Sequence, residues 1–238
     1  MSSTKNPGRF AGLLYILMSI PGFFAMVYVP SKLIVYGNAT ATANNVAASE
    51  TLFRLGIAAQ LISQAGFIFV ALALYDLLKG VNRRQASLMV TLIVVSIPIA
   101  FVNELNSIAA LVLVRGTDFL SIFEKPQRDA LARLFLNLHG QGLGVAEIFW
   151  GLWLFPLGLL VYRSRFLPRF LGVWLVFAGI AWVIQSLTGL LLPQYEDKVD
   201  AYSQPAVLGE VAFMLWLAIK GAKPPALEAT GSSSAPSS

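Results

Sequence analysis

Residues 169–192 read RFLGVWLVFAGIAWVIQSLTGLLL, and this stretch decides the fold class. Its one charged residue is Arg169 at the first position, and Pro193 follows it directly. A helix that crosses a bilayer needs about 20 mostly apolar residues. The apolar residues are continuous rather than alternating, which argues against a barrel strand. The stretch therefore predicts a membrane-spanning helix.

Five other segments have the same character, so the sequence predicts an all-α, polytopic membrane protein with a six-transmembrane-helix bundle. We expect a membrane domain over residues 1–220, with helices at residues 10–29, 54–78, 86–114, 137–162, 169–192 and 203–219. The first segment is longer than the 7–15 residues typical of a signal peptide, so we expect it to be retained. Residues 221–238 are rich in Ala, Ser and Pro, which predicts a disordered tail.

Composition supports this class and excludes several kinds of site. Of 238 residues, 57% belong to the apolar set and 12% are charged, whereas a soluble domain has about 25% charged residues. The chain has no Cys and one His, which excludes disulfides, thiolate metal sites and a three-histidine zinc site. We therefore expect no cofactor and assign no metal site.

The basic residues predict an orientation, because Lys and Arg in short loops mark the cytoplasmic side of a membrane. Six helices place all the basic turns and both termini on one side, with these residues: Lys5, Arg9, Lys79, Arg83, Arg84, Arg163, Arg165, Arg169, Lys220 and Lys223. We predict cytoplasmic termini, a location in the plasma membrane and contact with anionic lipid headgroups. The net charge of +5 then requires no nucleic-acid partner.

Several short motifs are spread along the chain up to about residue 195. The strongest is EIFWGLWLFPLG at residues 147–158, followed by RSRFLP at residues 163–168 and Leu171-Gly172. Others are RFAGLLY at 9–15, ASETLFR at 48–54, LALY at 72–75 and KGVNR at 79–83. These stretches resemble a bacterial multi-pass membrane family, domain of unknown function family 4386. The resemblance implies a helical membrane protein and supplies neither an activity nor catalytic residues.

Polar residues inside the predicted helices define a candidate ligand-binding site. Intramembrane ionisable residues cost about 2.5–3.5 kcal/mol each and usually face the bundle interior. At 1.5 Å per residue, Glu104 lies about 16 Å, Glu210 about 10 Å and Gln60 about 9 Å from the outer ends of their helices. The inner halves are nearly all apolar, which predicts a polar cavity open to the outside and closed toward the cytoplasm. Its candidate residues are Arg54, Gln60, Gln64, Asn103, Glu104, His139, Gln141, Glu147, Gln185 and Glu210.

Three functions are compatible with this pattern. We favour a non-enzymatic protein that binds, senses or transports a small molecule, and rank a channel low because a pore needs polar lining through both leaflets. An intramembrane enzyme would use Glu104 and Glu147 as acid and base with His139 at the rim. A structural or partner-binding subunit would use the amides only for interhelical hydrogen bonds, worth about 0.6 kcal/mol each, and would pair a glutamate with Arg54 or a backbone donor.

The sequence also predicts the structural role of three local features. Gly140-x-Gly-x-Gly144, Gly172 and Gly179 are expected to let helices pack closely. The segment after Pro126, with apolar residues on one helical face, either lies in the membrane interface or extends the fourth helix outward. Residues 31–53 contain a polar, small-residue stretch and are expected to form an external loop.

Overall fold

The computed structural model describes residues 6–224, which are helical apart from short turns and contain no strand. The predicted disordered tail lies outside the described residues from residue 225 onward. The elements are α1 (Pro7–Phe23), the π-helix η1 (Phe24–Tyr28), α2 (Val29–Leu33), α3 (Ala39–Ala48), α4 (Glu50–Leu78), α5 (Arg83–Arg115), η2 (Asp118–Leu120), α6 (Lys125–Leu152), α7 (Leu154–Arg163), α8 (Arg169–Leu191), η3 (Pro193–Tyr195) and α9 (Glu196–Ile219).

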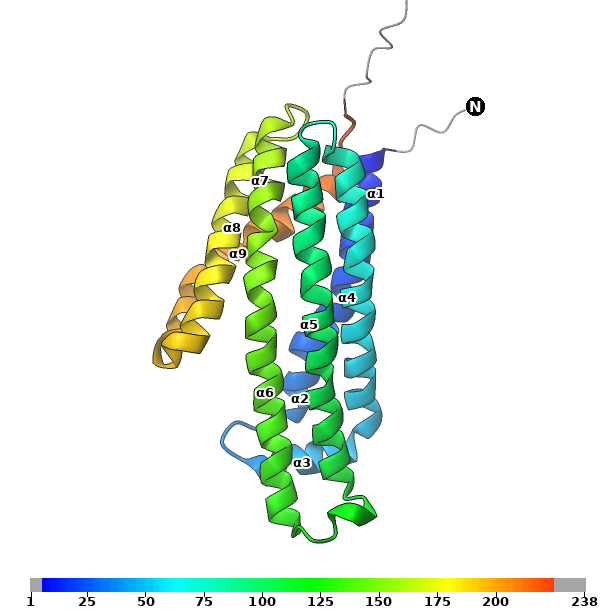
Figure 1. Ribbon diagram of the computed structural model, residues 1–238, viewed down its shortest axis with the longest axis vertical. Coiled ribbons are helices and arrows are strands. Elements are labelled where there is room, and N and C mark those ends of the chain that lie inside the picture. Colours follow the sequence, from blue (N-terminus) through cyan, green and yellow to red (C-terminus); the bar gives the residue numbers. More distant parts are fainter. Residues whose placement is uncertain (1–5, 225–238) are drawn as a thin grey trace, which may run out of the picture.

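Six stretches are long and apolar enough to cross a membrane, which confirms the predicted all-helical, six-span fold class. They are Pro7–Leu33, Glu50–Leu78, Arg83–Arg115, Lys125–Arg163, Arg169–Leu191 and Pro193–Ile219. The long helices run side by side along the long axis of the molecule, and the α8–α9 hairpin ends short of the tip of α6 (Figure 1). Such a shape fits a multi-pass protein whose lipid-facing surface is apolar.

The two ends of the described chain lie side by side. Gly8 N donates to the Ala222 carbonyl oxygen at 3.0 Å, and Ala222 N donates to Asn6 Oδ1 at 2.9 Å. The α4–α5 and α7–α8 turns lie at this same end, which we call the terminal end; the opposite end is the distal end (Figure 1). The basic turns therefore share one end of the bundle, while its cytoplasmic orientation remains a prediction.

Helices extend beyond the apolar segments that marked them. The fourth span begins at Lys125 rather than at residue 137, so the segment after Pro126 extends that helix outward. Glu124 caps its first turn in a capping box with Gln127, which satisfies free backbone donors. The sixth helix likewise begins at Glu196 rather than at residue 203. Hydropathy marks the membrane-embedded part of a helix, whereas capping decides where the helix begins.

The polar stretch expected to be a loop contains the short helix α3. Asn38 begins it by accepting a hydrogen bond from Ala41 N at 2.9 Å, as an N-cap residue does. Thr42, Ala43 and Val46 are buried, and α3 packs against the outer part of α6. The distal end therefore carries an ordered cover over part of the bundle.

The terminal half of the bundle is densely packed. Its core centres on Tyr15, Leu74, Met89, Trp153 and Phe213, all of them buried. The Tyr15 ring packs edge-on against Phe67, with ring centroids 5.4 Å apart. This core closes the bundle interior toward the terminal end.

Paired glycines bring α8 against α6 and α7. A Cβ placed on Gly158 would lie 2.6 Å from the Gly172 carbonyl oxygen, and one placed on Gly151 would lie 2.7 Å from the Gly179 carbonyl oxygen. Both distances are shorter than real Cβ contacts. The prediction that Gly172 and Gly179 permit close packing is therefore confirmed.

Candidate functional site

A cavity of about 600 Å³ lies in the distal half of the bundle, and we call it the distal cavity. Residues of the first span, α4, α5, α6 and α8 line it, together with Glu196 of α9. Its polar side chains come from five different helices: Gln60, Glu104, Ser107, Arg133, Asn137, His139, Gln141, Glu147, Gln185, Ser186 and Glu196. Residues remote in the sequence thus face one space.

One wall of the distal cavity is apolar. It is formed by the first span, where η1 interrupts the α-helix between two prolines, Pro21 and Pro30. Each proline lacks a backbone N–H group, which weakens the regular hydrogen-bond ladder, and single π-helical turns occur frequently at functional sites. The residues that line the cavity here are Ala25, Met26, Val29, Pro30, Leu33 and Ile34.

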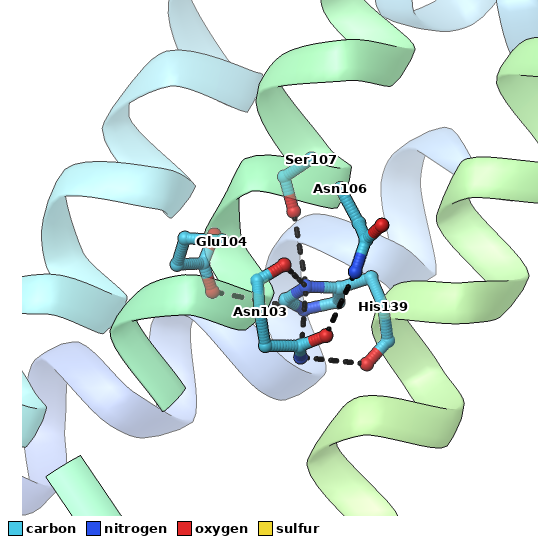
Figure 2. Close-up of polar contacts among 5 residues, drawn as sticks. All are labelled: Asn103, Glu104, Asn106, Ser107 and His139. Carbon is cyan, nitrogen blue, oxygen red and sulfur yellow. Dashed lines mark hydrogen bonds and ion pairs between the residues drawn. The ribbon is translucent and has the colours of Figure 1, made fainter. Parts of the chain in front are cut away.

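The opposite wall carries a hydrogen-bonded group centred on His139 (Figure 2). Asn103 Nδ2 donates to the His139 carbonyl oxygen at 2.8 Å, and Ser107 Oγ lies 3.1 Å from His139 Nδ1. Asn106 Nδ2 donates to Asn103 Oδ1 at 3.0 Å. These contacts join α5 to α6 and hold the imidazole at the cavity wall.

Glu104 lies on the other side of the same imidazole, with Oε1 3.7 Å from His139 Nε2. If the Ser107 hydroxyl donates to Nδ1, the ring proton lies on Nε2 and faces this carboxyl group. Glu104 is only 3% exposed. Gly142 permits the close approach of the two helices, since a Cβ there would overlap the Asn103 amide.

Two buried amides at the cavity wall have polar atoms without a partner among residues 6–224. Gln60 is 3% exposed, and neither its Oε1 nor its Nε2 makes a hydrogen bond. Gln185 Oε1 is likewise unpartnered. A buried polar group without a partner costs about 1–3 kcal/mol, so native proteins rarely keep one without a reason.

Glu147 contributes a second carboxyl group to the distal cavity. None of the ion pairs found within the described chain involves it. Gln141 lies six residues before it on α6 and also lines the cavity. On this part of the wall, Glu147 and Gln141 therefore present a carboxyl group and an amide group to the space.

A second cavity of about 200 Å³ lies deeper in the bundle, and we call it the deep cavity. It shares Met26 and Gln60 with the distal cavity and is lined by Ser63, Gln64 and Glu210 among others. The Tyr15 hydroxyl donates to the Glu210 carboxyl group, and Trp182 Nε1 lies 3.4 Å from Glu210 Oε2. Gln60 therefore stands between the two cavities.

The structure brings most of the predicted site residues together, in two groups. The distal cavity receives Gln60, Glu104, His139, Gln141, Glu147 and Gln185, and the deep cavity receives Gln60 again with Gln64 and Glu210. Asn103 is not at either surface but supports His139.

Arg54 does not join the candidate site. Its Nε lies 2.7 Å from Glu50 Oε1, and about half of its side chain is exposed. At 100° per residue, Arg54 lies about 120° around α4 from Gln60, on another face of the helix. The alternative in which Arg54 pairs with Glu104 or Glu147 is therefore not what the structure shows.

The glycines of the Gly140-x-Gly-x-Gly144 motif do not all pack against a helix, which corrects the expectation for them. Only Gly142 does so, against Asn103; a Cβ on Gly140 or Gly144 would meet no atom within 4 Å. Both residues line the distal cavity. The missing side chains leave space in the cavity wall.

Sequence reasoning missed two charged residues of the site, Arg133 and Glu196. Both lie in helical turns outside the predicted apolar segments. Arg133 stands four residues before Asn137, so helical spacing from the polar face of α6 could have found it. No local signal in the sequence points to Glu196.

The described residues contain no group of three His, Cys, Asp or Glu side chains placed to hold a metal ion. The side chains at the distal cavity offer carboxyl, amide, hydroxyl, imidazole and guanidinium groups beside an apolar wall. Such an arrangement can bind a molecule that has both polar and apolar parts.

Comparisons with known proteins agree with the resemblance seen in the motifs. The family described as "Domain of unknown function (DUF4386)" matches residues 10–221. An uncharacterized protein of Archaeoglobus fulgidus is 33% identical over 156 residues, which cover 66% of this chain and 77% of that protein. No solved structure matches the chain. With nearly its whole helical bundle matched, this six-span protein belongs to the DUF4386 family.

Proposed function

We propose that this protein binds a small molecule within the membrane, in the distal cavity, as part of transport or sensing. The observation that carries the proposal is Gln60, a buried side chain at the cavity wall whose amide has no partner among residues 6–224. The cavity volume of about 600 Å³ falls in the range of about 300–1,000 Å³ that is typical of ligand pockets. A bound molecule would supply the missing hydrogen bonds.

Hydrogen bonds elsewhere in the bundle weigh against a purely structural role for the Gln60 amide. Serines already join the helices: Ser63 Oγ donates to the Met18 carbonyl oxygen at 2.7 Å, and Ser186 Oγ donates to the Gly144 carbonyl oxygen at 2.6 Å. If the amides served only packing, they would be expected to make such contacts too. Gln60 makes none within the described chain.

The packed terminal half supports binding from one side. Trp153 lines the deep cavity and is buried together with Tyr15 and Leu74, so the space does not continue toward the terminal end as an open channel would. Transport would then require this core to rearrange, whereas sensing would require only a shift in the helices that line the cavity. Binding is the step that both functions share.

Native mass spectrometry of the protein released from its own membrane tests the proposal. We compare the wild type with Gly144→Leu, in which the new side chain enters the cavity because no atom lies within 4 Å of the Cβ position. Gly80→Leu is the matched control, since Gly80 has equally open surroundings but lines neither cavity.

We expect a non-covalent adduct on the wild type and on Gly80→Leu that Gly144→Leu has lost. The same adducts on all three proteins would identify them as surface lipid. That result, or a folded wild type without any adduct, would refute the proposal.

A further inference from the structure

The charges around the distal cavity favour a positively charged ligand. Three carboxyl groups line it, from Glu104, Glu147 and Glu196, against one permanently charged basic side chain, Arg133. His139 adds at most one further positive charge. Carboxyl groups therefore outnumber cations whichever form the imidazole takes.

The Arg133 guanidinium is already engaged by an aromatic ring that lines the same cavity. The Arg133 guanidinium carbon lies 5.7 Å from the centroid of the Tyr36 ring, a distance at which the ring face attracts a cation. Glu147, by contrast, has no basic partner in the described chain. An opposite charge nearby favours the ionised form of a carboxyl group, so a cationic ligand would stabilise Glu147 at this wall.

The buried amide atoms without a partner narrow the chemical class of the ligand further, because most of these atoms are hydrogen-bond acceptors. Among the fully buried side-chain atoms of the described residues that line the cavity, Gln60 Oε1, Gln185 Oε1 and Gln60 Nε2 have no partner, so two of the three are acceptors. Together with the carboxyl groups, the wall offers acceptors for several N–H donors. A primary ammonium or a guanidinium carries such donors, whereas a quaternary ammonium carries none.

The opposite wall accepts an apolar body. Met26, Val29, Pro30 and Leu33 of the first span face the space, and they bring no charged group to it. A ligand that spans the cavity would therefore place its head at the acceptors and its hydrocarbon part against η1 and α2.

From this geometry we infer that the ligand of the distal cavity is an amphiphilic amine or guanidine whose N–H groups bind Glu147 and the Gln60 and Gln185 amides. The inference rests on the proposed function and gives the ligand class for the same cavity. It excludes carboxylates and quaternary ammonium compounds as preferred ligands.

Isothermal titration of the protein in lipid nanodiscs with four matched probes tests this inference. The probes are octylamine, octyltrimethylammonium, octanol and octanoate, which share one hydrocarbon chain and differ in the head group. Nanodiscs with Gly144→Leu protein report the heat of partition into lipid, which is subtracted. A charge-assisted hydrogen bond contributes about 1.5–3 kcal/mol, so we expect octylamine to bind with a Kd at least about tenfold below the other three.

Variants assign the effect to the acceptors. Glu147→Gln should raise the octylamine Kd at least about tenfold, for the same reason. Asp118→Asn is the control, because Asp118 is exposed and lines neither cavity, and it should change the Kd less than about twofold. If Glu147→Gln does not fold, Gln60→Leu removes the unpaired amide and should weaken octylamine binding while sparing octanol.

Two kinds of result would overturn the inference. In the first, another probe (octanol, octanoate or the quaternary compound) binds as tightly as octylamine at a site that Gly144→Leu removes. The cavity would then bind ligands of a different class, and the proposed function would survive. The other is the absence of saturable octylamine binding by a wild-type protein that retains its native adduct. Loss of the adduct itself concerns the proposed function alone, so the two failures are distinguishable.

Discussion

Replacement of glycine by alanine should have opposite effects on stability at Gly158 and at Gly144. In Gly158→Ala the new Cβ lies 2.6 Å from the Gly172 carbonyl oxygen and 2.8 Å from Val176 Cγ2. Ordinary contact begins at 3.4 Å, so α7 and α8 would have to separate by about 0.8 Å. The obstructing atom belongs to the backbone of a packed helix, which cannot move aside as a flexible side chain can.

The expected free energies follow from these distances. Overpacking costs about 1–3 kcal/mol, whereas Ala in a helix is favoured over Gly by about 0.5–1 kcal/mol. Because the obstructing atom belongs to the backbone, the upper half of the overpacking range applies, and Gly158→Ala should lower the free energy of unfolding by about 1–2.5 kcal/mol. In Gly144→Ala no atom lies within 4 Å of the new Cβ, so only the favourable effect remains and stability should rise by about 0.5–1 kcal/mol.

Unfolding by sodium dodecyl sulfate in mixed micelles, followed by tryptophan fluorescence, measures both changes against the wild type. Gly172→Ala is a reciprocal check, because its Cβ would meet the Gly158 carbonyl oxygen at 2.6 Å. A Gly158→Ala protein as stable as the wild type would refute the close approach of α7 and α8. A Gly144→Ala protein destabilised to the same extent would refute the open space at the cavity wall.

Three further results are expected. Cysteine placed at Ser107 should react with a membrane-impermeant maleimide added at the distal side. Cysteine at Leu105, which is 60% exposed on the surface of a predicted span and lines neither cavity, should not react, because we expect it to face lipid and thiolate forms only in water. Reporter fusions after Arg84 should be cytoplasmic and those after Lys125 external; a cytoplasmic signal at Lys125 would contradict the orientation. Tyr15→Phe removes the hydroxyl that donates to Glu210 and should cost about 1–3 kcal/mol in the same titration, so unchanged stability would argue against that contact.

Local sequence was sufficient for the number and kind of helices. A spanning helix satisfies its own backbone hydrogen bonds and needs only a long apolar stretch, so each span could be recognised without knowledge of its neighbours. Depth along each helix was also predictable, because the rise per residue is constant. Glu104, His139 and Glu147 were therefore assigned to one half of the bundle before their contacts were known.

Helix ends were less predictable, because they depend on capping and on short polar turns rather than on hydropathy. The Glu124–Gln127 capping box begins α6 well before the apolar segment, and this extension carries Arg133 to the distal cavity. The helix α3 arises in the same way from Asn38 in a stretch without apolar periodicity.

Only the tertiary structure decided which polar side chains meet. Gly158 and Gly144 are the same residue in the same kind of helix, yet one packs against a carbonyl oxygen and the other borders a cavity. Arg54 and Gln60 belong to one helix, yet one pairs with Glu50 outside the site and the other stands unpartnered between two cavities. Composition and the helical repeat determine on which face of a helix a residue lies and at what depth. Its neighbours depend on how helices distant in the sequence cross and on how closely their packed side chains let them approach.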